Sequence, residues 1–177
     1  MASRRFKALR IIGGILLMAG AVALGFFILS RYAGSWGVPY FTFTTERGST
    51  CKNDFAGYTC TPLTLAEVEF HAEVELPDDT SVISGSYRST HDYQLNAVLD
   101  VPAASAPAAA TALNETFGAC VKGQPPPLDT TGLTQVCVIS NSDVVSNDGE
   151  PASRLYTVGT GVREDGSRPI VLSIKSR

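Results

Sequence analysis

The longest apolar run in the chain lies close to its N-terminus. Residues 11–30 form twenty consecutive positions without a charge, between Arg10 and Arg31. A helix of that length reaches about 30 Å, which is the thickness of the hydrocarbon core of a bilayer. The pattern predicts one transmembrane helix over 11–30, preceded by a short basic segment, 1–10.

This apolar segment could be a secretory signal that is cleaved or an anchor that is retained. The small residues from Ala21 to Ala23 resemble a cleavage site, but the apolar run continues beyond them to Leu29. Because the apolar core of a signal has only about 7 to 15 residues, we expect an uncleaved signal-anchor. Basic residues gather before the run, at Arg4, Arg5, Lys7 and Arg10. By the positive-inside rule the N-terminus is expected in the cytoplasm and the chain after residue 31 outside the cell membrane.

Residues around the span indicate further contacts with the lipid bilayer. Aromatic rings follow the span where amphipathic rings favour the headgroup layer, although the same rings could begin a core: Tyr32, Trp36, Tyr40 and Phe41. Small residues recur four positions apart within the span, as Ala19 with Ala23 and Ala21 with Gly25. That spacing lets two helices approach closely, so weak self-association is an option, although small residues that face lipid are the favoured explanation.

Polar and apolar positions alternate after residue 64. Over 67–76 every second residue is apolar, and the positions between hold acidic groups and one imidazole: Glu67, Glu69, His71, Glu73 and Glu75. A period of two predicts a strand with one face in the core. We expect a second strand over 81–89 and a third over 91–101, with alternate residues from Tyr93 to Val101 facing inward.

A helix and three further strands are expected in the rest of the chain. Ser105, Pro107 and Gly118 bound a helix over 105–117. Strands are predicted over 134–140, 154–163 and 168–176, with a hairpin turn at Asp165-Gly166. The predicted order is β-β-β-α-β-β-β, an α+β domain over 65–177 with one mainly antiparallel sheet and a packed helix. Residues 31–64 are expected to form a juxtamembrane connector.

Charge limits the partners of the predicted external part. Five of the 14 basic residues and none of the 17 acidic ones precede residue 32, so the remainder carries a formal charge of −8. Binding to nucleic acid or to an anionic lipid surface needs basic patches. Nucleic acid and anionic lipid surfaces are therefore disfavoured as partners. No cofactor is expected either.

All four cysteines lie in the predicted external part, where an oxidising compartment permits disulfides. They are Cys51, Cys60, Cys120 and Cys137. Three pairings are possible in principle. We expect the one that closes the two short loops, Cys51 with Cys60 and Cys120 with Cys137. Zinc is disfavoured because its cysteine ligands usually come as C-x2-4-C pairs.

The acidic ladder is the most distinctive candidate for a site. If it formed one strand face, neighbouring side chains would be about 6.6 Å apart, and Glu69, His71 and Glu73 could hold a metal ion. A solvated face is the more economical interpretation. A third interpretation is a partner surface for a basic protein, formed by Glu67, Glu69, Glu73 and Glu75.

Catalysis has little support in the sequence. His71 and His91 are the only histidines, and the chain contains neither G-x-S-x-G nor H-E-x-x-H. No catalytic residue is assigned.

In layout the chain resembles the uncharacterised small single-pass envelope proteins of high-GC Gram-positive bacteria: a basic N-terminus, one span and the juncture WGVPYFTFTTERG, residues 36–48. The resemblance implies no activity. The sequence favours a membrane-anchored, non-catalytic interaction module that binds another envelope protein or a cell-wall component through its sheet face or the loops 123–129 and 141–151. The alternative is an anchored hydrolase, or a metal or ligand sensor, with a site assembled from dispersed residues.

Overall fold

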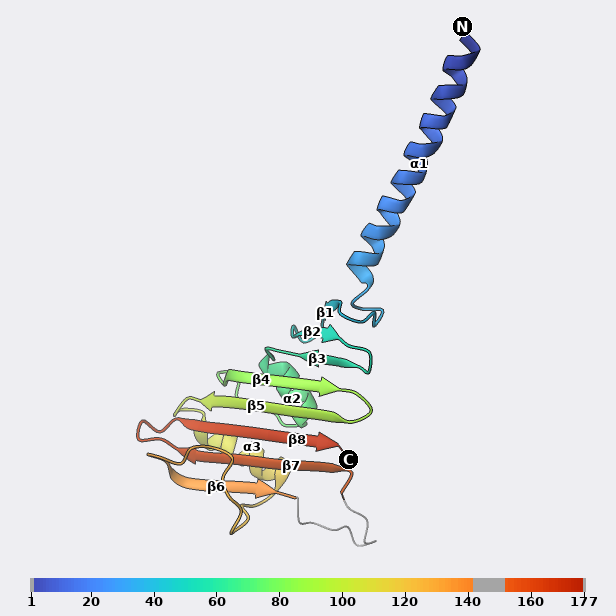
Figure 1. The fold of residues 1–177 in the computed structure, drawn as a ribbon. Coiled ribbons are helices and arrows are strands. Elements are labelled where there is room, and N and C mark those ends of the chain that lie inside the picture. Colours follow the sequence, from blue (N-terminus) through green and yellow to red (C-terminus); the bar gives the residue numbers. More distant parts are fainter. Residues whose placement is uncertain (1, 142–151, 177) are drawn as a thin grey trace.

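The computed structural model describes residues 2–141 and 152–176. Within these ranges a long N-terminal helix is followed by an eight-stranded sheet and two shorter helices (Figure 1). The elements in chain order are α1 (Ala2–Tyr32), β1 (Thr42–Thr44), β2 (Thr50–Asn53), β3 (Tyr58–Cys60), α2 (Leu65–Ala72), β4 (Ser81–Ser89), β5 (Tyr93–Val101), α3 (Ala106–Phe117), β6 (Thr134–Ser140), β7 (Arg154–Val162) and β8 (Arg168–Ser176).

Neighbouring strands of the described sheet are antiparallel, in the order β1-β2-β3-β4-β5-β8-β7-β6. The first five strands follow each other as a meander. After β5 the chain passes through α3 to β6 at the far edge and returns through β7 to β8. Strand β8 pairs with β5, with Ile170 opposite Leu99. The C-terminal strand therefore lies inside the sheet, which joins its two halves.

One face of the sheet carries the core. Helices α2 and α3 both lie behind the sheet in Figure 1, and their apolar residues share one buried cluster with β5 and β8. The cluster includes Val68, Ala72, Leu95, Leu99, Leu113, Phe117, Ile170, Leu172 and Ile174. Burying one such large side chain stabilises the fold by roughly 1.5–3 kcal/mol. The inward alternation predicted for 93–101 is found in β5, where Leu95, Ala97, Leu99 and Val101 are buried.

The strand predicted over 67–76 is wrong, because α2 occupies its first half. Thr64 is the N-cap of this helix, and its hydroxyl accepts from the backbone N–H of Glu67. A threonine followed three residues later by glutamate is a helix-start signature. Val68 and Ala72, four residues apart, satisfy a helical period as well as a period of two. Glu73 then ends α2 in the left-handed conformation, with φ of 57°.

The predicted strand count and order are wrong for a second reason. Residues 31–64, expected as a connector, supply β1, β2 and β3, and β3 pairs with β4. These strands have only three or four residues, so alternation within each is too short to detect. The sheet therefore begins closer to α1 than the sequence indicated.

The C-terminal half follows the sequence more closely. Helix α3 ends at Phe117, before Gly118, and the turn between β7 and β8 contains Gly166 with φ of 83°. Ser105 precedes α3, but its hydroxyl donates to Asp79 instead of capping the helix. Expected contacts within 142–151 lie outside the described residues.

Candidate functional site

The acidic residues of 67–76 do not form one face. Because they lie on a helix and the turn after it, they point to different partners. Glu67 is buried, and Glu69 Oε1 accepts from the backbone N–H of Leu76 at 2.8 Å. Glu73 Oε2 pairs with Arg154 Nη1 at 2.8 Å, while Glu75 is exposed. The surface expected from Glu67, Glu69, Glu73 and Glu75 is therefore not assembled as a continuous strip.

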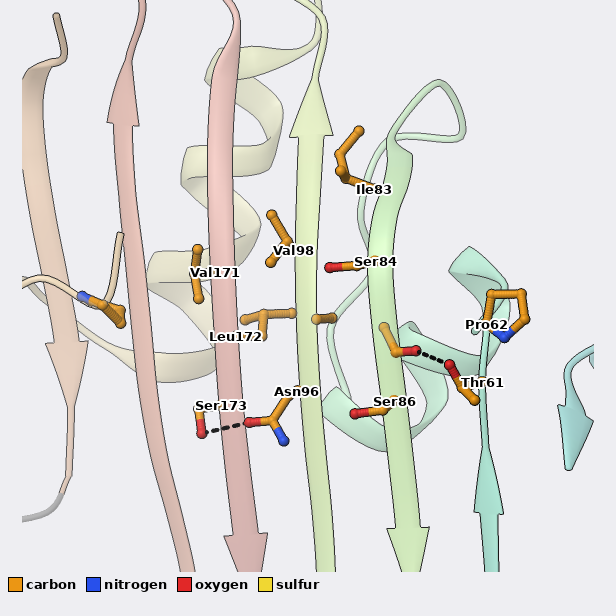
Figure 2. A pocket seen from close by; sticks show the side chains of 13 residues that line it. Thr61, Pro62, Ile83, Ser84, Ser86, Asn96, Val98, Val171, Leu172 and Ser173 are labelled. Carbon is orange, nitrogen blue, oxygen red and sulfur yellow. Dashed lines mark hydrogen bonds between the residues drawn. The ribbon is translucent and has the colours of Figure 1, made fainter. Parts of the chain in front are cut away.

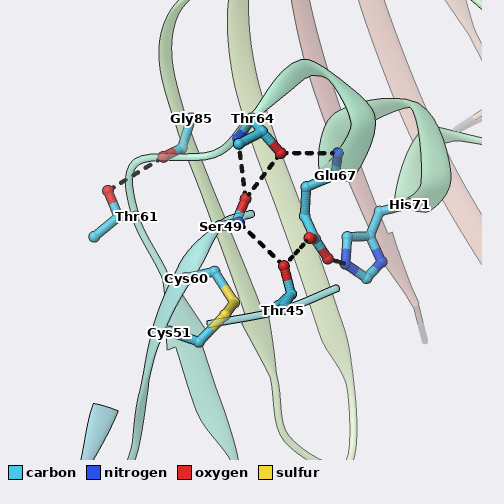
Figure 3. The surroundings of a disulfide bond; sticks show 9 residues. All are labelled: Thr45, Ser49, Cys51, Cys60, Thr61, Thr64, Glu67, His71 and Gly85. Carbon is cyan, nitrogen blue, oxygen red and sulfur yellow. Dashed lines mark hydrogen bonds and ion pairs between the residues drawn. A yellow bond between two sulfur atoms is a disulfide. The ribbon is translucent and has the colours of Figure 1, made fainter. Parts of the chain in front are cut away.

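The buried Glu67 is the centre of a partly buried hydrogen-bond network (Figure 3). Thr45 Oγ1 donates to Glu67 Oε2 at 2.5 Å, and His71 Nε2 lies 3.1 Å from Glu67 Oε1. Thr45 Oγ1 in turn accepts from the backbone N–H of Ser49 at 3.1 Å. A buried carboxylate is costly unless its oxygens are hydrogen-bonded. The network meets that need and ties α2 to the β1–β2 hairpin.

The His71 ring is held between this network and the sheet. It stacks on Tyr87 of β4 with ring centroids 3.6 Å apart and planes 10° apart. Burial lowers the pKa of His71, although Glu67 raises it in part, and the cation of Arg47 lowers it further. Burial also raises the pKa of Tyr87. Both shifts favour neutral side chains at this contact.

The arrangement of Thr45, Glu67 and His71 differs from that of a hydrolytic triad. In such a triad the imidazole lies between the hydroxyl and the carboxylate, so that it can accept the hydroxyl proton. Here the carboxylate lies between the hydroxyl and the imidazole. Glu67 therefore fixes the positions of both partners, and His71 does not contact Thr45 as a base would. His91 is exposed in the turn between β4 and β5.

The candidate metal residues also have other partners. Across the described ranges, no three His, Cys, Asp or Glu side chains converge as a group that could hold a metal ion. Of Glu69, His71 and Glu73, the first accepts from a backbone amide and the last pairs with Arg154. Arg154 also donates from Nη2 to the carbonyls of His71 and Ala72, at 3.2 and 2.7 Å. A cation at the C-terminal end of α2 complements the helix dipole.

The opposite face of the sheet carries a groove that the sequence did not predict. Figure 2 views this face with the helices behind it. The groove has a volume of about 630 Å³ and crosses β4, β5 and β8. Its lining combines aliphatic and proline side chains with small hydroxyls and one amide: Thr61, Pro62, Ile83, Ser84, Ser86, Asn96, Val98, Pro127, Val171 and Ser173.

The groove surface is neutral and partly apolar. Ile83 is 65% exposed and lies at the register shift of β4, between Val82 and Ser84. Ser173 Oγ donates to Asn96 Oδ1 at 3.1 Å, and Thr61 Oγ1 donates to the Gly85 carbonyl at 3.2 Å. No residue lining the groove in the described part of the chain carries a formal charge. This composition suits a ligand that is uncharged and presents both polar and apolar groups.

Glycines in the strands shape the border of the groove. A Cβ atom at Gly159 of β7 would lie 2.5 Å from Pro127 Cδ and 2.6 Å from Leu128 Cδ2. Only glycine therefore lets this proline-rich segment lie directly on the sheet. A glycine inside a strand often marks a close approach by another backbone or a ligand. In the sequence, Gly159 inside a predicted strand could therefore have indicated that another segment lies against the sheet there.

The disulfides stabilise the two ends of the sheet. Cys51 pairs with Cys60 across β2 and β3, and Cys120 pairs with Cys137 of β6. The first is buried in the core, whereas Cys120 is exposed. The second disulfide closes the loop that contains Pro127. It therefore limits how far the groove border can move.

A second hollow, of about 680 Å³, lies on the other side of this loop. Two of its acidic groups have local partners: Asp129 accepts from Thr131, and Asp165 accepts from Ser167. These hydrogen bonds lower the pKa of both carboxyl groups. Because they explain the carboxylates without a ligand, the neutral groove is the stronger candidate site.

Helix α1 provides the remaining functional element. From Ile12 to Tyr32 it is long and apolar enough to cross a membrane, and its side chains over this stretch are exposed. The disulfides are compatible with an oxidising, extracytoplasmic location. No family model, curated protein or solved structure matches the chain. The candidate function therefore rests on α1, the disulfides and the groove.

Proposed function

We propose that the protein is an uncleaved single-pass membrane protein with its N-terminus in the cytoplasm and a non-catalytic interaction module outside. The neutral groove on the open sheet face contacts another envelope protein or a cell-wall component. The observation that carries this proposal is the groove itself, where the exposed Ile83 lies among small hydroxyls. Interaction surfaces often expose such apolar groups beside polar ones.

The groove replaces the acidic ladder as the contact surface. Glu67 is hydrogen-bonded inside the domain, and Glu73 pairs with Arg154. Groups already engaged in this way must lose those partners before they can bind another protein. The groove needs no such exchange, because the exposed side chains of Ile83 and Ser84 already face solvent.

A crosslinking capture tests the contact. A photoreactive side chain replaces Ser84 in the full-length, C-terminally tagged protein, and intact cells are irradiated. The matched control places the same group at Ser81, which is exposed on the same strand but does not line the groove. We expect one reproducible adduct from position 84 and none from position 81.

A blocking variant then tests whether the groove is responsible. Ser86→Arg should abolish the adduct at position 84, whereas Ser81→Arg should preserve it. Peptides of a second protein in the digested adduct identify a protein partner, and sensitivity to a glycan-cleaving enzyme identifies a wall component. Equal adducts at positions 81 and 84, or an adduct unaffected by Ser86→Arg, would show that the groove is not the contact.

The anchor is tested on the same cells. The tagged protein should sediment with membranes at the full 18.7 kDa of the chain plus the mass of the tag, and protease added outside should remove the C-terminal tag. A shortened band in the soluble fraction would indicate cleavage at the segment around Ala21 to Ala23. A protected tag would overturn the proposed orientation.

A further inference from the structure

Exposed aromatic rings gather where α1 meets the sheet. Tyr32 and Trp36 stack with centroids 5.9 Å apart, and Tyr40 meets Phe55 edge-on at 5.3 Å. Trp36 is 60% exposed, Tyr40 65% and Phe55 81%. We call Tyr32, Trp36, Tyr40 and Phe55 the juxtamembrane patch. None of these rings belongs to the described core, so the interpretation of the early aromatics as the start of a core does not apply to them.

Phe55 belongs to this patch only through the fold. It lies in the turn between β2 and β3, far along the chain from α1. Asn53, at the end of β2, holds the turn beside Tyr40: the Tyr40 N–H donates to the Asn53 carbonyl at 2.9 Å, and the Asn53 N–H donates to the Phe41 carbonyl at 3.0 Å. The sequence pattern of the span could not have identified Phe55.

The end of α1 is fastened to the edge of the sheet. Ala33, directly after the helix, is fully buried, and Asn53 Nδ2 donates to the Gly34 carbonyl at 2.7 Å. A Cβ atom at Gly34 would lie 1.8 Å from the carbonyl oxygen of Thr42 in β1. The helix therefore does not join the domain through a loose linker. Its end fixes the position of β1 and of the β2–β3 turn (Figure 1).

We propose that the domain lies against the bilayer that α1 crosses, with the juxtamembrane patch inserted into the outer headgroup layer. The inference rests on the proposed anchor, because α1 determines where the bilayer surface lies. Tyrosine and tryptophan favour this layer since their rings are partly apolar and partly polar. Phe55 adds a fully apolar ring at the same end of the domain. The patch therefore faces the lipid interface next to Tyr32.

The chemistry of the turn limits the depth of insertion. The Asp54 carboxylate accepts from the Ala56 N–H at 2.7 Å within the turn. A carboxylate is costly to place in hydrocarbon but is hydrated among headgroups. We therefore expect Phe55 at headgroup depth and not in the acyl core. Insertion would restrict rotation of the domain about α1. The groove would then keep one orientation relative to the membrane surface.

Tryptophan fluorescence in vesicles can test this placement, because Trp36 is the only tryptophan in the chain. Full-length protein is reconstituted into phosphatidylcholine vesicles whose acyl chains carry bromine near the headgroup or near the bilayer centre. Wild type reports on Trp36. Three variants move the single tryptophan: W36F with F55W, W36F with F27W inside α1, and W36F with I83W.

The Ile83 variant is the matched control for an exposed apolar position away from the bilayer. Ile83 is also highly exposed, but it lies on β4, three strands from β1, which is about 14 Å at the usual strand spacing. We expect bromine near the headgroup to quench the fluorescence of Trp36 in wild type and of the tryptophan in F55W. The fluorescence of I83W should remain unquenched. F27W lies within the span, between its centre and the outer headgroup layer, so bromine at one depth or both should quench it.

The outcomes separate this inference from the anchor. If F27W is quenched but F55W resembles I83W, α1 is anchored and the domain stands away from the bilayer, so the inference is wrong. If F27W is not quenched, the anchor itself is wrong. Each variant must also retain the Cys51–Cys60 and Cys120–Cys137 disulfides, which shows that the domain has folded.

Discussion

The imidazole of His71 stacks on the phenol ring of Tyr87 at 3.6 Å, while its Nε2 lies 3.1 Å from Glu67 Oε1. This contact joins α2 to β4 and places a titratable ring between a carboxylate and the sheet. The position of the ring follows from the helix, which brings residues 67 and 71 to the same side. It also makes the stability of the domain dependent on pH.

Stability should decrease as pH falls from about 7 to 5. Burial lowers the pKa of His71 in the folded protein, so the unfolded chain binds the proton first. This contribution is complete above the unfolded pKa of about 6.5 and is lost as pH falls through the lower folded value. Thermal unfolding of the full-length protein in detergent, followed at pH 7 and pH 5, measures the effect. His71→Phe should reduce the dependence, whereas His91→Gln, at an exposed turn, should retain it. Equal dependence in wild type and His71→Phe would contradict the assignment.

Removal of the Glu67 carboxylate should destabilise the domain. In Glu67→Ala, the Thr45 hydroxyl and the His71 ring both lose a partner in a partly buried site. Each unsatisfied group costs roughly 1–3 kcal/mol. Chemical denaturation should show a loss of that order, with a smaller loss for Glu67→Gln. As a control, Glu75→Ala at an exposed position should change the free energy of unfolding by no more than about 0.5 kcal/mol. A similar loss in Glu67→Ala and Glu75→Ala would refute the role of the network.

The two disulfides should differ in their reactivity toward a reductant under native conditions. Cys51 and Cys60 are 1% and 0% exposed, whereas Cys120 is exposed. Thiol–disulfide exchange requires access to a sulfur atom. Brief treatment with a reductant, followed by alkylation and mass spectrometry, should label Cys120 and Cys137 first. Replacing both of these by serine should cost about 3 kcal/mol through the entropy of the released loop. Earlier labelling of Cys51 would show that β2 and β3 open more readily than the structure implies.

Gly159→Ala should displace the segment that borders the groove. The added Cβ atom would approach Pro127 to 2.5 Å, and a proline ring cannot rotate away as a flexible side chain would. Overpacking of this kind costs roughly 1–3 kcal/mol. Gly161→Ala is the matched control on the same strand, because its nearest contact is the flexible Leu133 side chain at 3.0 Å. Thermal unfolding should show the larger loss for Gly159→Ala, and a larger loss for Gly161→Ala would contradict this account.

Local patterns predicted several elements well. Helix α3 and strands β5, β6 and β8 have the periodicity or turn residues that propensity rules detect, and the Asp165-Gly166 turn lies where expected. The prediction of a strand over 67–76 was wrong because Val68 and Ala72 fit both a period of two and a helical face. The Thr64 cap and Glu67 resolved that ambiguity in favour of a helix. Sequence position alone also could not show that β1 to β3 extend the sheet, since each forms only by pairing with its neighbours.

The sequence by itself determined the apolar length of α1, the charge asymmetry around it, the position of all four cysteines after it and the alternation of β5, because each depends only on the order of residues along the chain. Only the tertiary structure decided which side chains meet. The return of β8 beside β5 brought Ser173 to Asn96, and the segment across Gly159 placed Pro127 at the border of the groove. The β2–β3 turn carried Phe55 to Tyr40. Such contacts depend on strand pairing between distant segments, and no local pattern encodes the partner of a strand.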